Sequence, residues 1–378
     1  MKKFILIPDS FKGTLSSKEI CEIMANSIKK ELPDATIISV PVADGGEGSV
    51  DCFLTALGGE RITCTAKGPY FDDMQGFYGL IDNGKTAVIE MSAVAGLPLV
   101  ESNKNPLKTT TYGVGELILH AVNSGAKKII LGLGGSCTND MGCGMASALG
   151  IDFFNKNGEK FIPTGGTLKD IDKIDISNKA KALEGIEIVA MCDVDNPPYG
   201  DSGASKIFAP QKGADEKAVI ELDNGVKWAC ERVKEHLGVD LSTLKGGGAA
   251  GALGAGVVAF LNGQLKMGID VVLQTVGFSD MLKDADCVFT GEGKIDGQSL
   301  RGKVVIGVAR ATKLANVPLI AVVGGAEGDM SEAYRQGVSA IFSINRLPEA
   351  FETARFKSKE NLEFAMDNLI KTLKINYK

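Results

Sequence analysis

Residues 4–41 read FILIPDSFKGTLSSKEICEIMANSIKKELPDATIISVP, and their apolar pattern decides the fold class. Phe4–Pro8 and Thr36–Pro41 are short apolar runs of the kind that form strands. Between them, over Ser16–Leu32, apolar residues recur at spacings of three and four, which predicts a helix. A strand, a helix and a second strand in this order predict a parallel sheet.

The same alternation returns at the end of the chain, in the apolar runs Asp286–Thr290, Val317–Val323 and Ala340–Ile344. The middle differs, because it opens near Arg61 with a predicted hairpin before further α/β units. We therefore predict an α/β fold: a discontinuous, doubly wound Rossmann-like domain (1–61 and 283–378) with an inserted second α/β domain (62–282). Loops at the carboxyl ends of strands would place the active site in the cleft between these domains.

Composition narrows the class of protein. The 378 residues carry a net charge of −6 without a basic stripe, which argues against a nucleic-acid partner. The first apolar run is too short for a signal peptide, and no run of about 18 apolar residues predicts a membrane span. Eight cysteines without a C-x-x-C pair predict a reducing, cytoplasmic compartment. Nothing in the sequence indicates the oligomeric state.

Residues 79–86, GLIDNGKT, match the P-loop pattern letter for letter. A P-loop is followed by a helix, whereas here the β-branched run TAVIEM follows. Asp82, Asn83 and Gly84 are typical of a tight turn. We interpret this stretch as a hairpin.

Residues 246–251, GGGAAG, match the dinucleotide fingerprint, with Asp270 about 20 residues later. The preceding DLSTLK is too polar for a buried first strand, which disfavours an NAD-dependent hydroxy-acid dehydrogenase. Two interpretations of this stretch stay open. Gly247 and Gly248 could bind phosphate at a helix start, or the small residues could serve close helix packing.

Phosphoryl transfer requires groups that hold phosphates, carboxylates that hold Mg²⁺, and a base or orienting group. Residues 133–140, LGGSCTND, follow the strand-like KKIILGL and precede the helical MGCGMASALG. Amides and hydroxyls at a helix start predict an anion site. Capping of that helix by Asp or Asn is the alternative. The binding residues predicted in this loop are Gly134, Gly135, Ser136, Thr138 and Asn139.

Carboxylates follow several predicted strands, and cations recur in the same loops. The acidic residues are Asp9, Asp44, Glu47, Asp193, Asp195, Glu292 and Asp296. The cations are Lys12, Lys294, Arg301 and Lys303, which suit anionic ligands. We further predict that Ser10, Gly45 and Gly46 contact substrate or phosphate. Both histidines lie inside predicted helices, so the base is predicted to be a carboxylate.

Taken together, PDSFKGTLSS, PVADGGEG, GLGGSCTNDMGCGMASALG, CDVDNP, GASKIFAPQKGA, GGGAAGALGAG and VFTGEGKIDGQSLRGK resemble the bacterial type I glycerate kinase family over nearly the whole chain. The resemblance implies a two-domain α/β fold and transfer of the ATP γ-phosphate to D-glycerate, usually giving 2-phosphoglycerate. Cys137 and Met141 depart from the usual GGSATNDGG-like loop, where we expect tuning of function.

On physical grounds, Asp193 or Asp296 is predicted to orient or deprotonate the glycerate hydroxyl. Mg²⁺ is predicted to be held by carboxylates from Asp193, Asp195 and Asp296, directly or through water. Lys12 and Arg301 would neutralise glycerate or the transferring group. A nucleotide-binding regulatory module without turnover is the alternative function.

The hairpin interpretation gives a first test. Lys85→Ala should lower kcat/KM for glycerate phosphorylation less than about tenfold, or about 1.4 kcal/mol of transition-state stabilisation, because a hairpin lysine does not hold phosphate. Steady-state kinetics measure this. A thousandfold loss in a folded variant would instead identify a P-loop.

Overall fold

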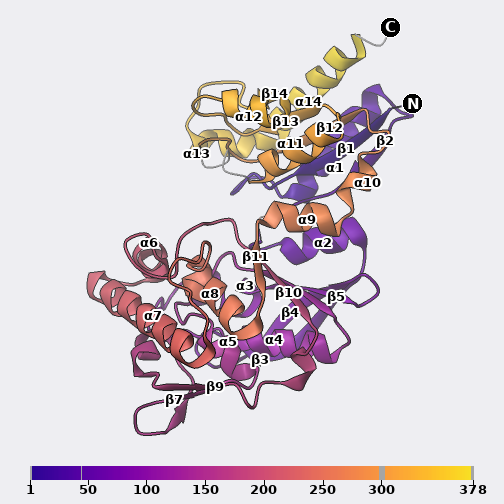
Figure 1. Cartoon of the computed structure of the whole chain (residues 1–378). Helices are drawn as coiled ribbons and strands as arrows, with labels where there is room; N and C mark the ends of the chain where they lie inside the picture. Colours follow the sequence, from indigo (N-terminus) through magenta and orange to yellow (C-terminus); the bar gives the residue numbers. More distant parts are fainter. Residues whose placement is uncertain (1, 44, 298–302, 376–378) are drawn as a thin grey trace. The chain divides into compact units, whose positions relative to one another are not determined.

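The computed structural model describes residues 2–43, 45–297 and 303–375. Contacts divide the chain into two units, and Figure 1 labels most of their helices and strands. Unit 1 comprises residues 1–44, 55–57 and 267–378, and unit 2 comprises residues 45–54 and 58–266. These divisions fall at other residues than the predicted 61 and 283. One reason is that α9 (Gly268–Thr275) packs on α11 (Val304–Leu314), where Ile269 leaves no room for a side chain at Gly307.

Unit 1 contains a five-stranded parallel sheet, and the predicted strands at both ends of the chain are confirmed. The sheet order is β14-β13-β12-β1-β2. The strands are β1 (Lys3–Pro8), β2 (Thr36–Ser39), β12 (Cys287–Gly291), β13 (Leu319–Val323) and β14 (Val338–Ser343), each parallel to its neighbours.

Helices cover both faces of this sheet, as expected of a doubly wound fold. The predicted first helix is α1 (Ser17–Glu31), which begins with a capping box between Ser16 and Glu19. It packs on α14 (Ser358–Ile375), and both join a core with Phe4 and Leu6 of β1. Helix α11 contacts β1 and β12 but is absent from that core, so it covers the other face. The remaining helices are α10 (Phe278–Met281), α12 (Ser331–Gln336) and α13 (Phe351–Ala354).

The chain order of unit 1 creates a topological switch point. From β1 the chain continues to β2 on one side, whereas β12 pairs with β1 on the other side, with Pro8 opposite Gly291. The loops after β1 and β12 therefore leave the sheet in different directions. Open α/β sheets bind their ligands at this place.

Unit 2 is built on a six-stranded mixed sheet of order β11-β10-β6-β5-β4-β3 and a small sheet of order β8-β7-β9. The large sheet consists of β3 (Glu60–Lys67), β4 (Asp73–Ile81), β5 (Thr86–Glu90), β6 (Lys128–Gly132), β10 (Glu187–Met191) and β11 (Gln264–Lys266). The small sheet consists of β7 (Asp152–Phe154), β8 (Lys160–Phe161) and β9 (Lys173–Asp175). The helices are α2 (Ser49–Leu57, which also enters unit 1), α3 (Ser92–Ala95), α4 (Tyr112–Asn123), α5 (Cys143–Ala148), α6 (Ala204–Phe208), α7 (Glu216–Leu237) and α8 (Ala249–Leu261). No helix among the described residues is long and apolar enough to cross a membrane.

The structure confirms the predicted surroundings of the P-loop match at 79–86 and of the dinucleotide match at 246–251. Strands β4 and β5 form an antiparallel hairpin whose turn residues Asp82, Asn83 and Gly84 have φ values of 52°, 53° and 80°. Lys85 is exposed at its end. Residues 241–248 form turns without a strand before α8, so the context of a dinucleotide fingerprint is missing.

Helix α8 begins with a left-handed turn. Ala250, Gly251 and Ala252 have φ values of 55°, 66° and 67°. Only the glycine adopts this conformation without steric cost, because a Cβ clashes with the following carbonyl at about 1–2 kcal/mol per residue. Gly251 lies against the 134–140 loop, where a Cβ would be 2.0 Å from the oxygen of Thr138, and its carbonyl accepts from the Met141 amide at 3.1 Å. The left-handed turn therefore supports that loop.

Strain at Ala250 is testable. Ala250→Gly should leave the free energy of unfolding unchanged or raise it by up to about 1 kcal/mol, because glycine relieves the left-handed φ. The matched control Ala255→Gly, in the buried right-handed part of α8, should lower it by about 1 kcal/mol or more. Urea denaturation measures both. Equal losses in the two variants would contradict the assigned strain.

Candidate active site

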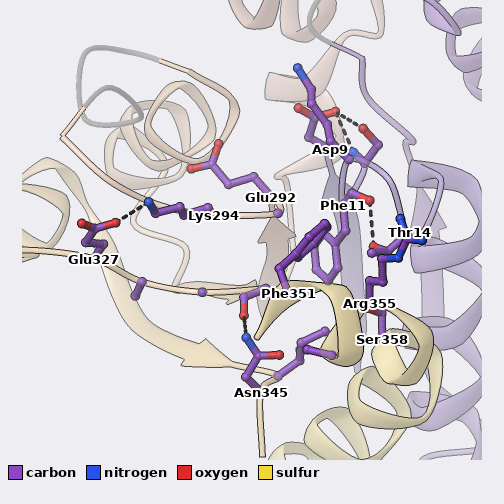
Figure 2. A pocket seen from close by; sticks show the side chains of 18 of the residues that line it. Asp9, Phe11, Thr14, Glu292, Lys294, Glu327, Asn345, Phe351, Arg355 and Ser358 are labelled. Atoms are coloured by element: carbon purple, nitrogen blue, oxygen red, sulfur yellow. Dashed lines mark hydrogen bonds and ion pairs between the residues drawn. The ribbon is translucent and has the colours of Figure 1, made fainter. Parts of the chain in front are cut away.

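Unit 1 has a cavity of about 740 Å³ at its topological switch point. Asp9, directly after β1, and Glu292, directly after β12, both line it. Figure 2 shows these two carboxylates and Lys294 coming from neighbouring loops, with Phe351 and Asn345 below them. The predicted gathering of strand-end carboxylates is thus present for this pair.

The loop after β1 is held by its own hydrogen bonds. The buried Asp9 accepts at Oδ1 from the amide of Ser10 at 2.6 Å, while its own amide donates to the carbonyl of Gly291 at 2.8 Å. Further along, the Phe11 amide donates to the Leu15 carbonyl at 2.9 Å. Asp9 and Ser10 are therefore fixed relative to β12, and Lys12 extends from the exposed tip of the loop.

Cations and acids alternate around this cavity. Its lining includes Lys12, Lys294, Lys303 and Arg355 as well as Glu327 and Glu349. Lys294 forms an ion pair with Glu327, and both side chains are more than half exposed. An exposed pair of this kind contributes little to stability, so an anionic ligand could displace the glutamate. The set suits phosphates together with a divalent cation.

An aromatic wall of the cavity was missed by the sequence reasoning. Phe351, from α13, is 56% exposed although it lines the cavity beside the buried Phe11. Asn345 donates from Nδ2 to the Gly324 carbonyl at 2.7 Å. An exposed ring next to a fixed amide is a surface on which a flat base could stack. The local sequence around Phe351, PEAFETARF, carries no motif that would reveal this role.

In unit 2, the carboxyl ends of β5, β6 and β10 form one row. Glu90 and Met191 lie on either side of Gly132. The 45–46 turn packs on this edge, where the amide of Gly134 donates to the carbonyl of Gly45 at 3.0 Å. A Cβ on Gly134 would lie 2.5 Å from the Cα of Gly46. Two of the predicted glycine motifs thus meet backbone to backbone.

Glu90 also holds the segment that follows this turn, and the sequence reasoning missed it as well. Its side chain is 2% exposed and accepts from the amide of Val50, at the start of α2, at 2.7 Å. Burial raises the pKa of this carboxyl, while the amides of Val50 and Gly48 oppose that shift. In the sequence, the only sign of this role was that Glu90 is the last residue of an apolar strand.

The 134–140 loop is tied to its surroundings by backbone hydrogen bonds. The Leu97 amide donates to the Gly135 carbonyl at 2.8 Å, and the Cys137 amide donates to the Ala95 carbonyl at 3.0 Å. Thr109 Oγ1 donates to the Cys137 carbonyl at 2.9 Å. The loop is therefore a rigid part of the core, with its exposed side at Gly135.

Asp140 anchors the end of this loop and is completely buried. Its Oδ2 accepts from the amide and hydroxyl of Thr111 at 2.7 and 2.8 Å and from the Gly144 amide at 3.3 Å. Its Oδ1 accepts from the Gly142 amide at 3.1 Å. Burial raises the pKa of this carboxyl, and the four donors oppose that rise.

These bonds revise the predicted helix-start anion site. Helix α5 has only six residues, and two amides at its start already donate to Asp140, so the capping alternative applies there. Thr138 and Asn139 are completely buried, and Asn139 Nδ2 donates to Ser205 Oγ at 3.0 Å. Gly135 is the exposed residue of the loop, Gly134 is partly exposed and Ser136 is 8% exposed. Contact of these three residues with substrate stays a prediction.

Met141 shows how the chain accommodates its departure from the usual glycine. It adopts a φ of 54°, in the region that favours glycine, and its side chain is fully buried. Its Sδ lies 3.8 Å from Cys230 Sγ in the core of unit 2. Burial of this side chain offsets the strained backbone.

The other predicted residues fall in several places. Asp193 and Asp195 follow β10 in unit 2, and Asp296 follows β12 in unit 1. Gly248 packs closely, since a Cβ there would lie 2.4 Å from the Pro197 carbonyl oxygen; phosphate binding by Gly247 and Gly248 stays a prediction. Asp44 and Arg301 lie outside the described residues.

No group of three or more His, Cys, Asp or Glu side chains in the described parts of the chain could hold a metal ion. Mg²⁺ bound with a nucleotide usually takes one or two carboxylates and completes its shell with phosphates and water. The carboxylates of Asp9 and Glu292, which both line the unit 1 cavity, fit that requirement. Metal binding by Asp193, Asp195 and Asp296 stays a prediction.

Comparisons with known proteins agree over the whole length. The family model described as Glycerate kinase family matches residues 4–374. The chain is similar to a glycerate kinase from Bacillus cereus (44% identity, covering 99% of this chain and 98% of that one) and to glycerate 2-kinase from Escherichia coli (42% identity, 99% and 98%). A crystal structure named for glycerate kinase 2 from Salmonella typhimurium LT2 matches with a TM-score of 0.88 at 38% identity, covering 100% and 99%.

The role of Asp140 as an anchor can be tested by Asp140→Asn. Both of its oxygens accept N–H groups, so the new amide nitrogen would face a donor in either orientation. The free energy of unfolding should fall by about 1–3 kcal/mol. Asp223→Asn is the control, because Asp223 accepts from Gly200 through one oxygen only, and its amide can keep that bond. Chemical denaturation with the same loss in both variants would contradict the anchoring role.

Proposed function

The chain belongs to the glycerate kinase family and is a kinase, and from that premise we propose that it transfers the γ-phosphate of ATP to a hydroxyl of D-glycerate. The cavity at the switch point of unit 1 carries this proposal. It combines two strand-end carboxylates, Asp9 and Glu292, with surrounding lysines, which is the chemistry required to bind a nucleotide with Mg²⁺.

The two wall residues of the cavity support ATP as the donor. Phe351 offers an exposed ring for the adenine base, and Asn345 offers an amide held by Gly324. On the charged side, Lys12 and Lys294 would contact phosphate oxygens. Mg²⁺, when bound, would offset part of the phosphate charge.

In the proposed reaction, a glycerate hydroxyl oxygen bonds to the γ-phosphorus while the bond from that phosphorus to the bridging oxygen breaks, and ADP leaves. The hydroxyl proton passes to a carboxylate, for which Asp193 and Asp296 are the candidates. Lys12 and Arg301 would neutralise the transferring group or the glycerate carboxylate. The predicted cleft between the domains stays a prediction.

We propose 2-phospho-D-glycerate as the product, because a relative with 42% identity is a glycerate 2-kinase. We also propose a cytoplasmic location, which agrees with eight cysteines that all lack disulfide bonds. Small molecules are the proposed partners.

One experiment tests the donor, the acceptor and the product. Purified protein is incubated with ATP, Mg²⁺ and D-glycerate, each also omitted in turn, and ³¹P NMR follows the phosphorylated product. ADP should form only when all three are present, and the product signal should be that of the 2-phosphate. Binding of ATP without turnover would favour the regulatory module, and binding of NAD without ATP turnover would favour the dehydrogenase.

The two base candidates belong to different units, so their variants also identify the unit that supplies the base. Asp193→Asn and Asp296→Asn keep size but remove the charge, and loss of a general base costs a factor of about 10² to 10⁴ in kcat. A variant that mainly raises the required Mg²⁺ concentration identifies a metal ligand. Steady-state kinetics at varied Mg²⁺ measure both effects.

Asp152→Asn and Asp240→Asn serve as controls for these two variants. Asp152 pairs with Lys160 and Asp240 with Lys234, and the pattern places both away from the reaction. Wild-type kcat in both the Asp193 and the Asp296 variant would refute the assignment and direct attention to Asp9 and Glu292.

A further inference from the structure

Lys212, at the end of the short 3₁₀ helix Pro210–Lys212, is a buried cation of unit 2 whose role the reaction scheme leaves open. Its side chain is 1% exposed. Its Nζ donates to Ser136 Oγ at 2.7 Å and to the Thr138 carbonyl at 2.7 Å. Burial of an ammonium group costs free energy that an apolar side chain of the same length would avoid. A purely structural link across this loop would not need the charge.

The surroundings leave Lys212 mostly protonated at neutral pH. Burial lowers its pKa to about 8, while the nearby carboxylate of Asp140 opposes that decrease. The Cys137 thiol is neutral, because burial raises its pKa to about 12. A protonated lysine has three donors and no acceptor. Each contact of Lys212 Nζ is therefore a donation.

This direction of donation determines what Ser136 can do. Its Oγ accepts from Lys212, so its own proton must point elsewhere. Within residues 2–43, 45–297 and 303–375, no protein acceptor for that proton is found. Ser136 is 8% exposed and follows the exposed Gly135, at the accessible side of the loop. The hydroxyl proton is thus available to a ligand at that side.

We propose that Lys212 is a positioning residue that holds the Ser136 hydroxyl as a hydrogen-bond donor to an anionic oxygen of a substrate. The chemistry fits the carboxylate of glycerate or a phosphate oxygen of the nucleotide, and this choice rests on the proposed function. Lys212 itself, buried behind the loop, acts through Ser136. Its charge also raises the donor strength of the hydroxyl, because hydrogen bonds polarise one another along a chain.

Unit 2 offers a matched control in Lys179. This lysine is also partly buried, its Nζ donates to the Phe260 carbonyl at 2.9 Å, and burial lowers its pKa. Among the described residues its Nζ donates to no hydroxyl, and Lys179 lies outside the glycine loops. Lys179→Met therefore removes a partly buried ammonium group without changing a substrate donor.

The test compares Lys212→Met, Ser136→Ala, their double variant and Lys179→Met. KM is measured for D-glycerate and for ATP, and each ligand's shift of the thermal midpoint reports binding without turnover. We expect KM for one of the two substrates to rise about 10- to 100-fold in both single variants, the range for losing one hydrogen bond to a charged group. The KM of the double variant should exceed the higher of the two single-variant KM values by no more than about twofold, because both changes remove the same donor. Lys179→Met should keep wild-type KM.

If the variants change KM and the thermal-midpoint shift for one substrate only, that substrate carries the anionic oxygen that Ser136 contacts. Wild-type KM for both substrates in Ser136→Ala overturns the proposal, even if Lys212→Met does not fold. Effects that multiply in the double variant overturn it as well, since they show that Lys212 acts separately. If the wild-type protein binds a ligand without phosphorylating glycerate, the proposed function fails, and the midpoint shifts still decide the role of Lys212.

Discussion

The candidate site in unit 2 depends on one steric constraint, the contact of two backbones without side chains between them. A Cβ on Gly134 would lie 2.5 Å from the Cα of Gly46, and a Cβ on Gly132 would lie 2.4 Å from the Gly45 carbonyl oxygen. Any larger residue at these positions would push the 45–46 turn off the sheet edge. The exposed Gly135 and the adjoining Ser136 keep their positions because the loop is held against this turn.

Buried charge fixes the loop from the other side. Asp140 accepts four hydrogen bonds and Lys212 donates two, so both buried groups have hydrogen-bond partners where water is excluded. Such groups cost stability when a partner is removed. The strained backbone at Met141 and Ala250 belongs to the same neighbourhood, where tight packing maintains conformations that would otherwise relax.

In unit 1, the order of the strands in the sheet creates the candidate site. Because β2 and β12 lie on opposite sides of β1, the loops carrying Asp9 and Glu292 separate and leave a cavity at the carboxyl edge. The strands fix where each loop begins, and the loops carry the charged side chains. Phe351 and Asn345 reach this cavity from the far end of the chain, where they complete a wall that no nearby sequence encodes.

The sequence alone determined the strands at both ends, the helix that follows Ser16, the hairpin at 82–84 and the family, because periodicity, turn chemistry and ordered motifs are local signals. It also placed Asp9 and Glu292 at strand ends. Only the tertiary structure decided that Asp140 caps α5, that Thr138 and Asn139 are buried, and that Lys212 and Phe351 join the sites. Burial and partners separated by 76 residues, as for Lys212 and Ser136, arise from how distant segments pack, and a local pattern carries no record of that packing.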